Sequence, residues 1–101
     1  MLAISARIEL AQKDMEAYTE QAKKIVAPTR KEKGCMLYAI STDINQANII
    51  WINELWETEE DLFAHLATAH IAEFLEFCSG VEMIDLKVDR YEVSSVGPLE
   101  F

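Results

Sequence analysis

The chain has 101 residues, half of them hydrophobic, with 18 acidic side chains against 9 basic ones and a formal net charge of −9. This length supports one domain of ordinary size with a single core. The negative charge excludes a general binder of nucleic acid or of anionic membranes, because both need clustered Lys and Arg. No apolar run approaches the roughly 18 residues that are needed to span a bilayer.

The start of the chain and its cysteines bear on where the protein resides. Arg7 and Glu9 interrupt the first ten residues, which therefore lack the basic-then-apolar layout of a secretory signal. Cys35 and Cys78 match neither a disulfide framework nor a zinc cluster, and we interpret both as buried thiols. We therefore expect a soluble, cytoplasmic domain with reduced cysteines.

Two segments in the first third of the chain show clear periodicity. Residues 2–10 alternate between apolar and other side chains, which predicts a strand. Residues 13–29 place their apolar side chains within about 100° of arc at helical spacing, which predicts an amphipathic helix. Tyr18 belongs to the apolar face of this helix, and Pro28 lies near its end.

A hairpin is predicted next, from strands over residues 35–42 and 49–56 that a polar turn over residues 43–48 connects. The second of these strands is apolar on both faces, whereas an antiparallel strand with one solvated face alternates. We therefore expect this strand to be covered on both sides. One face carries Ile50, Ile52 and Trp56, and the other carries Ile49, Trp51 and Leu55.

A second helix is predicted to begin after Thr58, whose hydroxyl can cap it, because three acidic residues follow and suit the positive end of the helix dipole. Its apolar residues form two stripes that are offset by roughly 130° at 100° per residue. One straight helix cannot bury both stripes against one surface. We therefore expect a bend or break within residues 67–70, and the end of the helix at Ser79 and Gly80.

The last strand is predicted over residues 81–93, where a change in the parity of the apolar residues indicates a bulge near Asp89. The order of elements is then β-α-β-β-α-β. This is the ferredoxin-like arrangement of the α+β class, in which two helices cover one face of a four-stranded antiparallel sheet. Residues 1–95 are expected to form this single domain, followed by a C-terminal tail at residues 96–101.

The uncovered face of such a sheet predicts an assembly. An apolar patch as large as the one expected from the strand over residues 49–56 normally marks an interface. The simplest cover is a second copy of the chain, which gives a homodimer with two sheets packed face to face about a two-fold axis. The alternative is a monomer whose own tail covers this face.

Several residues follow a pattern that runs through most of the chain: a glycine that enters the second strand, a strand that ends in Glu-x-Trp, an acidic helix start, and His-x-x-x-x-His before an aromatic residue. They are Gly34, Tyr38, Glu54, Trp56, Glu59, Glu60, Asp61, His65, His70 and Phe74. With this pattern, over about residues 1–95, the chain resembles the antibiotic biosynthesis monooxygenase family.

The resemblance implies a dimeric α/β barrel with a pocket between sheet and helices in each subunit. Monooxygenases of this family use no flavin, haem or metal, because an electron-rich phenol or hydroquinone reduces oxygen itself, so we expect no cofactor. Relatives on the same scaffold include haem-degrading enzymes and an isomerase. The haem-degrading enzymes carry an Asn, Trp and His set that is missing here, since the Trp position holds His65 and the ligand position holds Leu75.

His65 and His70 are the only histidines and the candidate catalytic residues. Five residues apart, they would lie about 140° apart on a straight helix, whereas a helical metal pair is spaced i,i+4, so no metal site is expected. Either can serve as a general base, because an imidazole ordinarily titrates near neutral pH. Asp61 and Glu73 have the spacing to orient the two rings. The alternative is a partly exposed histidine that caps the bend.

Four further residues are candidates for a substrate pocket, namely Glu54, Trp56, Tyr38 and Tyr18, whose hydroxyl can reach into it. Glu54 interrupts an apolar strand, and a buried carboxylate needs a partner, for which Arg7, Arg90 and a histidine are available. Glu54 is therefore either half of a structural ion pair or a pocket residue. Trp56 and Tyr38 can form flat walls for an aromatic ligand or serve as ordinary core or interface aromatics.

Together these features predict a cofactor-independent monooxygenase that oxidises a small aromatic phenol or hydroquinone with O₂, in which His65 or His70 helps to deprotonate the ring. One alternative is a non-oxidative isomerase of a small carbonyl compound, whose histidines shuttle protons. Another is a small-ligand-binding dimer without turnover. No nucleophile motif or phosphate-binding glycine loop supports other chemistry. We expect a homodimer, with neither nucleic acid nor a membrane as partner.

Overall fold

The computed structural model describes the whole chain, residues 1–101. The predicted strands and helices are present, with ends that differ from the prediction by at most two residues. In chain order the elements are β1 (Leu2–Leu10), the 3-10 turn η1 (Gln12–Asp14), α1 (Met15–Arg30), β2 (Cys35–Thr42), β3 (Ile49–Trp56), α2 (Glu59–Leu66), α3 (Ala69–Cys78) and β4 (Met83–Glu92).

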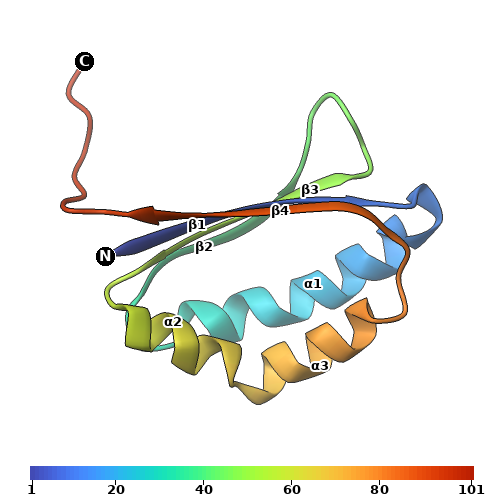
Figure 1. Cartoon of the computed structure of the whole chain (residues 1–101), viewed down its shortest axis with the longest axis horizontal. Helices are drawn as coiled ribbons and strands as arrows, with labels where there is room; N and C mark the ends of the chain where they lie inside the picture. The colour runs from blue at the N-terminus through green and yellow to red at the C-terminus, as the bar shows by residue number, and fades with distance from the viewer.

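The four strands form one antiparallel sheet in the order β2-β3-β1-β4. Each helical connection passes over one strand, since the chain skips β3 between β1 and β2 and skips β1 between β3 and β4. The helices all lie on one face of the sheet, below the strands in Figure 1, and the C-terminal residues rise on the other side. This is the predicted ferredoxin-like arrangement of the α+β class.

The core lies between the inner face of the sheet and the helices. The even-numbered residues of β1 point inward, because alternation along a strand puts them on one face. Each fully buried aliphatic side chain contributes about 1.5–3 kcal/mol. The buried cluster consists of Leu2, Ala6, Ile8, Leu10, Met15, Tyr18, Ala22, Ile25, Tyr38, Ile50, Ile52, Trp56, Leu62, Ile71 and Phe74.

The second helical segment is broken, as its two apolar stripes predicted. α2 ends at Leu66 and α3 begins at Ala69. The break lets α2 bury Leu62 while α3 buries Ile71 and Phe74. Of the first predicted stripe only Leu62 reaches the core, since Phe63 and Leu66 are 54% and 49% exposed.

The outer face of the sheet, opposite the helices, is apolar at one end and charged at the other. At the apolar end Leu37, Tyr91 and Val96 are 49%, 53% and 54% exposed and help to line a cavity of about 370 Å³. At the charged end Arg7 pairs with Asp85 at 3.5 Å. The apolar surface expected on this face is thus confined to one end.

Part of the outer face is covered by the chain itself. Ile49 is buried, and Trp51 and Leu55 are half-buried. The connection between β2 and β3 rises from this face in Figure 1, and Trp51 Nε1 donates a hydrogen bond to Asp43 Oδ2 in that connection at 2.9 Å. The other oxygen, Asp43 Oδ1, accepts from the backbone N–H of Asn45 at 2.8 Å, which fixes the turn.

The bulge predicted near Asp89 is wrong. β4 pairs with β1 in an unbroken register through this residue, and the irregularity lies instead near the start of β4, where Glu9 and Leu10 face Asp85 and Met83 and Ile84 is left without a partner. Tyr91 pairs with Ala3 on the outer face, whereas Leu86 and Val88 lie on the helix side of the sheet, where they remain 51% and 55% exposed. The change in parity near Asp89 therefore reflects apolar residues on both faces of the strand, not an extra residue at that point.

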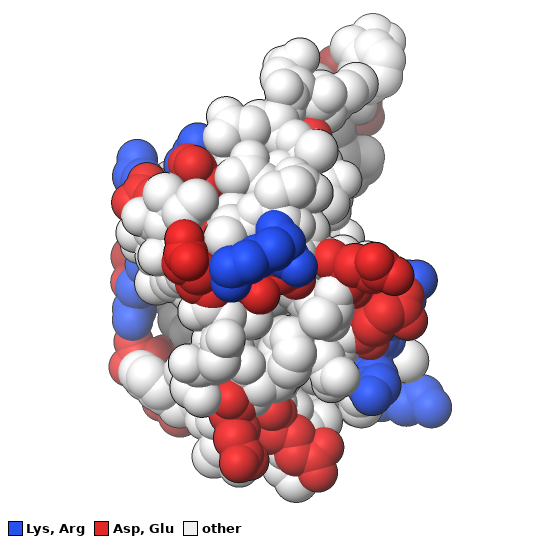
Figure 2. Space-filling model, turned by 90° about the vertical axis from the view of Figure 1, so that its right-hand side faces the viewer, with Lys and Arg blue, Asp and Glu red and all other residues white.

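The surface shows where charge gathers. On the side of the molecule seen in Figure 2, basic side chains lie beside acidic ones and form no continuous patch. The longest helix, α1, has 16 residues, and no helix is both long enough and apolar enough to cross a membrane.

Candidate active site

A short loop after α1 positions an acidic side chain over the sheet. α1 ends at Arg30 and β2 begins at Cys35. Between them, Gly34 has a φ of +79°, a left-handed conformation that glycine adopts readily. Its carbonyl accepts a hydrogen bond from the backbone N–H of Glu57 at 2.9 Å, which ties the loop to the end of β3. The loop thereby holds Glu32 in a fixed place.

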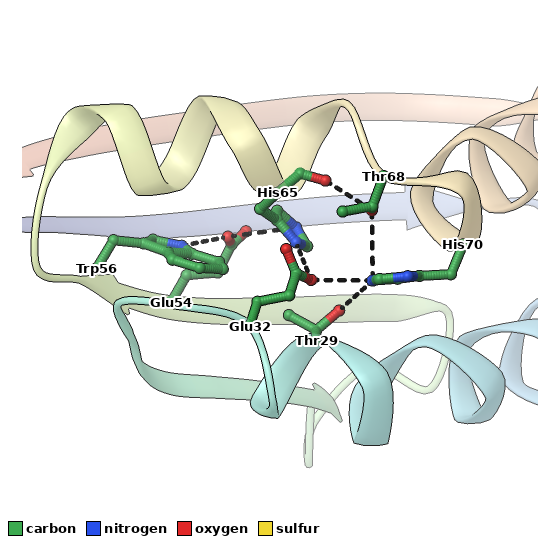
Figure 3. Close-up of polar contacts among 7 residues, drawn as sticks. All are labelled: Thr29, Glu32, Glu54, Trp56, His65, Thr68 and His70. Atoms are coloured by element: carbon green, nitrogen blue, oxygen red, sulfur yellow. Dashed lines mark hydrogen bonds and ion pairs between the residues drawn. The ribbon is translucent and has the colours of Figure 1, made fainter.

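Glu32 joins the two histidines. Its Oε2 lies 2.9 Å from Nδ1 of His65 and 2.9 Å from Nε2 of His70, as Figure 3 shows. One carboxylate oxygen accepts both hydrogen bonds, so with Glu32 ionised each facing ring nitrogen carries a proton. The side chains of Glu32 and His65 are only 15% and 3% exposed. Away from bulk water these contacts are electrostatically strong.

The break between α2 and α3 brings the two rings to the same oxygen. His65 lies near the end of α2 and His70 near the start of α3. The predicted separation of about 140° applies to a straight helix and therefore does not hold across the break. In the break, Thr68 donates from Oγ1 to the carbonyl of His65 at 2.8 Å, which links the two helices.

His65 is enclosed by aromatic side chains. Its ring centroid lies 4.8 Å from that of Trp56 and 5.4 Å from that of Tyr38. All three residues are buried, with exposed fractions of 2%, 0% and 3% for His65, Trp56 and Tyr38. Trp56 and Tyr38 therefore act as walls around an imidazole.

Glu54 stands at the buried end of the network. Its Oε1 accepts a hydrogen bond from Trp56 Nε1 at 2.9 Å and lies 4.0 Å from Nε2 of His65. Of the partners predicted for this carboxylate, the histidine is the one that faces it. Arg90 bonds Glu59 and Glu92 instead.

Burial governs the protonation of Glu54 and its neighbours. Desolvation raises the pKa of the Glu54 carboxyl, against the opposing effects of the Trp56 hydrogen bond and the charge of His65. Burial likewise raises the pKa of the Tyr38 hydroxyl, and the nearby charge of Glu54 adds to the effect. The pKa of the Cys35 thiol is raised by desolvation and by the carboxylates of Glu32 and Glu54. The interior of the site thus favours neutral groups.

His70 forms the outer end of the network. Its side chain is 24% exposed, and its Nε2 lies 3.3 Å from Thr29 Oγ1 and 3.4 Å from Thr68 Oγ1. The groups therefore run in series from Glu54 through His65 and Glu32 to a histidine at the surface. Such a series can pass a proton between the interior and the solvent.

The predicted site residues divide between this network and three cavities. Tyr18 lines a cavity of about 350 Å³ between α1 and β2, Tyr38 lines a second of about 350 Å³, and Glu54 borders the outer-face cavity. His65, His70 and Trp56 line none of them.

Tyr18 stands apart from the network. Its ring packs edge-on against Phe74 with centroids 5.3 Å apart, and its buried hydroxyl has no hydrogen-bond partner. Burial raises the pKa of this hydroxyl, so that it stays protonated and able to donate.

Sequence reasoning missed Glu32, the residue that connects the others. Asp61 and Glu73 were expected to orient the histidines because of their helical spacing, but neither bonds a ring. The Asp61 carboxylate packs against Gly34. The signal in the sequence was an acidic residue, Glu32, two positions before Gly34. The chain reverses direction in this loop between α1 and β2, and the side chain of Glu32 therefore points toward α2 and α3.

The chain matches the family described as antibiotic biosynthesis monooxygenase over residues 1–76, a range that includes every member of the network. No curated protein matches the chain.

Solved structures share the whole fold. A protein from Deinococcus radiodurans, provisionally named an antibiotic biosynthesis monooxygenase, has 23% identity and a TM-score of 0.88, with 100% of both chains covered. One from Nitrosomonas europaea with the same provisional name has 20% identity and a TM-score of 0.87, covering 94% of this chain and 100% of its own. A Pseudomonas aeruginosa protein has 26% identity and a TM-score of 0.84 over 93% and 94% of the two chains.

Proposed function

The chain belongs to the antibiotic biosynthesis monooxygenase family, and from this membership we propose that it is a cofactor-independent monooxygenase that oxidises a small phenol or hydroquinone with O₂. The observation that carries the proposal is the pair of hydrogen bonds, each 2.9 Å long, that Glu32 makes to His65 and His70. A deprotonated aromatic ring is a far better electron donor than its neutral form, so the enzyme needs a base near the ring and a route for the proton.

The network supplies both of these. His65 is the inner base, with Glu54 4.0 Å from its Nε2 and Glu32 at its Nδ1. His65 takes the substrate proton at Nε2 and gives its Nδ1 proton to Glu32. His70, whose side chain reaches the solvent, accepts that proton at Nε2 in the tautomer that carries its own proton on Nδ1. The carboxylate of Glu32 stabilises the imidazolium that forms in this step.

The reaction balances without an added reductant. A hydroquinone and O₂ give a hydroxyquinone and water, so that one oxygen atom enters the ring and the other leaves as water. The substrate anion first passes one electron to O₂, the resulting radicals combine into a peroxide, and loss of water completes the oxidation. The protein holds the ring, takes up its proton and returns a proton to the departing oxygen.

We assign the ring of the substrate to the cavity between α1 and β2. Its volume of about 350 Å³ suits a single aromatic ring. The buried Tyr18 hydroxyl, which has no partner, offers a hydrogen bond to a substrate oxygen. Ile40 lines this cavity and lies two residues beyond Tyr38 on the same strand, so the cavity ends beside the aromatic wall of His65. Movement of Tyr38 then joins the cavity to the base.

A homodimer is part of this proposal. The apolar end of the outer face exposes Leu37, Tyr91 and Val96, and a second copy of the same face covers it with matching chemistry. The charged end carries both signs, with Arg7 beside Asp85, so that two copies related by a two-fold axis can pair opposite charges.

Oxygen consumption tests the function. Metal-free protein is assayed with a panel of hydroquinones, together with His65→Ala, His70→Ala and the control Glu76→Gln, an exposed carboxylate on α3. Loss of either histidine is expected to lower the rate of oxygen consumption about 100-fold, whereas the Glu76→Gln control keeps the wild-type rate. Oxygen uptake that the protein does not accelerate would refute the proposal. Substrate loss without oxygen uptake would instead identify an isomerase.

A further inference from the structure

The network that is proposed to move protons has the composition of a metal site. Glu32 Oε2, His65 Nδ1 and His70 Nε2 all lie within 4.8 Å of one another. They come from three separate segments, namely the loop after α1, the end of α2 and the start of α3. Two imidazoles and one carboxylate form a ligand set that divalent transition metals prefer.

The distances fit this composition. Metal bonds of about 2.0–2.1 Å place neighbouring ligand atoms about 3.0–3.4 Å from one another. The two histidine nitrogens each lie 2.9 Å from the Glu32 oxygen. A shared cation therefore needs each nitrogen to move a few tenths of an ångström away from the Glu32 oxygen, while the two nitrogens, which lie within 4.8 Å of each other, settle about 3.0–3.4 Å apart.

The surroundings supply what a ligating histidine needs. When His65 binds through Nδ1, its proton sits on Nε2, which faces the Glu54 carboxyl at 4.0 Å. A carboxylate behind a ligating imidazole fixes the ring and strengthens it as a ligand. The net charge of −9 attracts cations. The exposed edge of His70 gives a path of entry.

We propose that Glu32, His65 and His70 bind one divalent transition-metal cation, with Zn²⁺ as the probe. The cation takes the place of the two ring protons that point at Glu32, and in each ring the proton moves to the other nitrogen. With the metal on Nδ1, His65 carries its proton on Nε2 and has no lone pair left to accept a substrate proton. The metal-bound form is consequently inhibited in the oxidation proposed above, although binding itself does not depend on that function.

Calorimetric titration of Zn²⁺ into metal-free protein tests the proposal. The titration uses a Cys35→Ser, Cys78→Ser background, so that thiols cannot act as ligands. We expect saturable binding of one equivalent, weakened at least about 10-fold by Glu32→Gln and by His70→Ala. Co²⁺ serves as a second probe, because its visible absorption reports nitrogen and oxygen ligands directly. The matched control is Glu76→Gln, an exposed carboxylate on α3 that should leave the affinity unchanged.

The proposal is overturned if the Cys35→Ser, Cys78→Ser protein shows no saturable binding, or if both site variants keep its affinity. Circular dichroism checks that each variant is folded. If Glu32→Gln is unfolded, the half-buried His70→Ala variant decides the question by itself. Because calorimetry and the Co²⁺ spectrum need no turnover, a protein that binds zinc but never consumes oxygen would refute the proposed function and still support the metal site.

Discussion

Gly34 and Asp61 interlock, because the carboxylate of Asp61 fills the space that a Cβ on Gly34 would occupy. Asp61 lies in the first turn of α2 and is only 8% exposed. Gly34 belongs to the loop that carries Glu32, whereas α2 carries His65. The close packing of these two residues therefore sets the distance between the carboxylate and the inner histidine.

Replacement of Gly34 by alanine is expected to disturb both stability and the site. The left-handed φ of +79° and the clash with Asp61 together should lower the free energy of unfolding by about 1–3 kcal/mol. The loop must move away from α2, which lengthens the contact between Glu32 and His65. Urea unfolding measures the first effect, and zinc affinity measures the second. Gly97→Ala is the control, since nothing lies within 4 Å of a Cβ there, and equal stability of the two variants would contradict the argument.

The cap of α2 should be worth about 1 kcal/mol. Thr58 Oγ1 accepts a hydrogen bond from the backbone N–H of Asp61 at 3.1 Å. An alanine at this position has no side-chain oxygen that could accept this bond. Thr58→Ala is therefore expected to lower Tm by about 4–8 °C for a domain of this size. Thr58→Ser keeps the acceptor and should stay close to the wild type in the same calorimetric scan. An equal loss in both variants would show that the methyl group matters rather than the cap.

The buried carboxyl of Glu54 should make stability fall as pH rises. Its pKa is raised above the ordinary value of 4.5 by burial, so between these two values the folded state holds a proton that the unfolded state has lost. The free energy of unfolding therefore decreases as pH rises through this window. Glu54→Gln removes this dependence, while its amide oxygen can still accept from Trp56.

Urea unfolding at pH 4, 5.5 and 7 checks this expectation. The stability of Glu54→Gln relative to the wild type should rise from the lowest pH to the highest, by about 1.4 kcal/mol for each unit by which the folded pKa exceeds the unfolded one. Glu57→Gln changes an exposed carboxyl just beyond the end of β3, and its stability relative to the wild type should be constant. A constant difference for Glu54→Gln would show that this carboxyl is not desolvated in solution.

A charge on the apolar end of the outer face should split the proposed dimer. Tyr91 is 53% exposed there, so Tyr91→Glu costs the monomer little but places two carboxylates in the interface. Light scattering should report the mass of two chains for the wild type and of one chain for the variant. Leu75→Asp, at a residue that is 56% exposed on α3, is the control and should leave the mass unchanged. A wild-type monomer at micromolar concentration would contradict the dimer.

The fold could be predicted almost entirely from periodicity. The alternation over residues 2–10 predicted β1, and the offset between the two apolar stripes predicted the break between α2 and α3. Both predictions succeeded because burial imposes a period on the sequence. The predicted bulge near Asp89 was wrong for a related reason. Tyr91 is apolar on the outer face, and parity alone cannot distinguish an extra residue from a second apolar surface on the same strand.

The candidate site was less accessible to sequence reasoning. His65, Trp56 and Glu54 were identified and do meet, because they share the inner face or pack directly on it. Glu32 lies 33 residues before His65, and no local spacing connects a loop to a helix across such a distance. The same holds for Thr29, which is fully buried beside His70.

The break between α2 and α3 has one more consequence. α3 packs against α1, whereas α2 packs against β3, so each histidine is anchored to a different part of the framework. The length of the hydrogen bond from His70 to Glu32 therefore depends on the position of α3, and the length of the bond from His65 to Glu32 depends on the position of α2. A displacement of α3 alone disconnects the inner histidine from the solvent and leaves its buried surroundings intact.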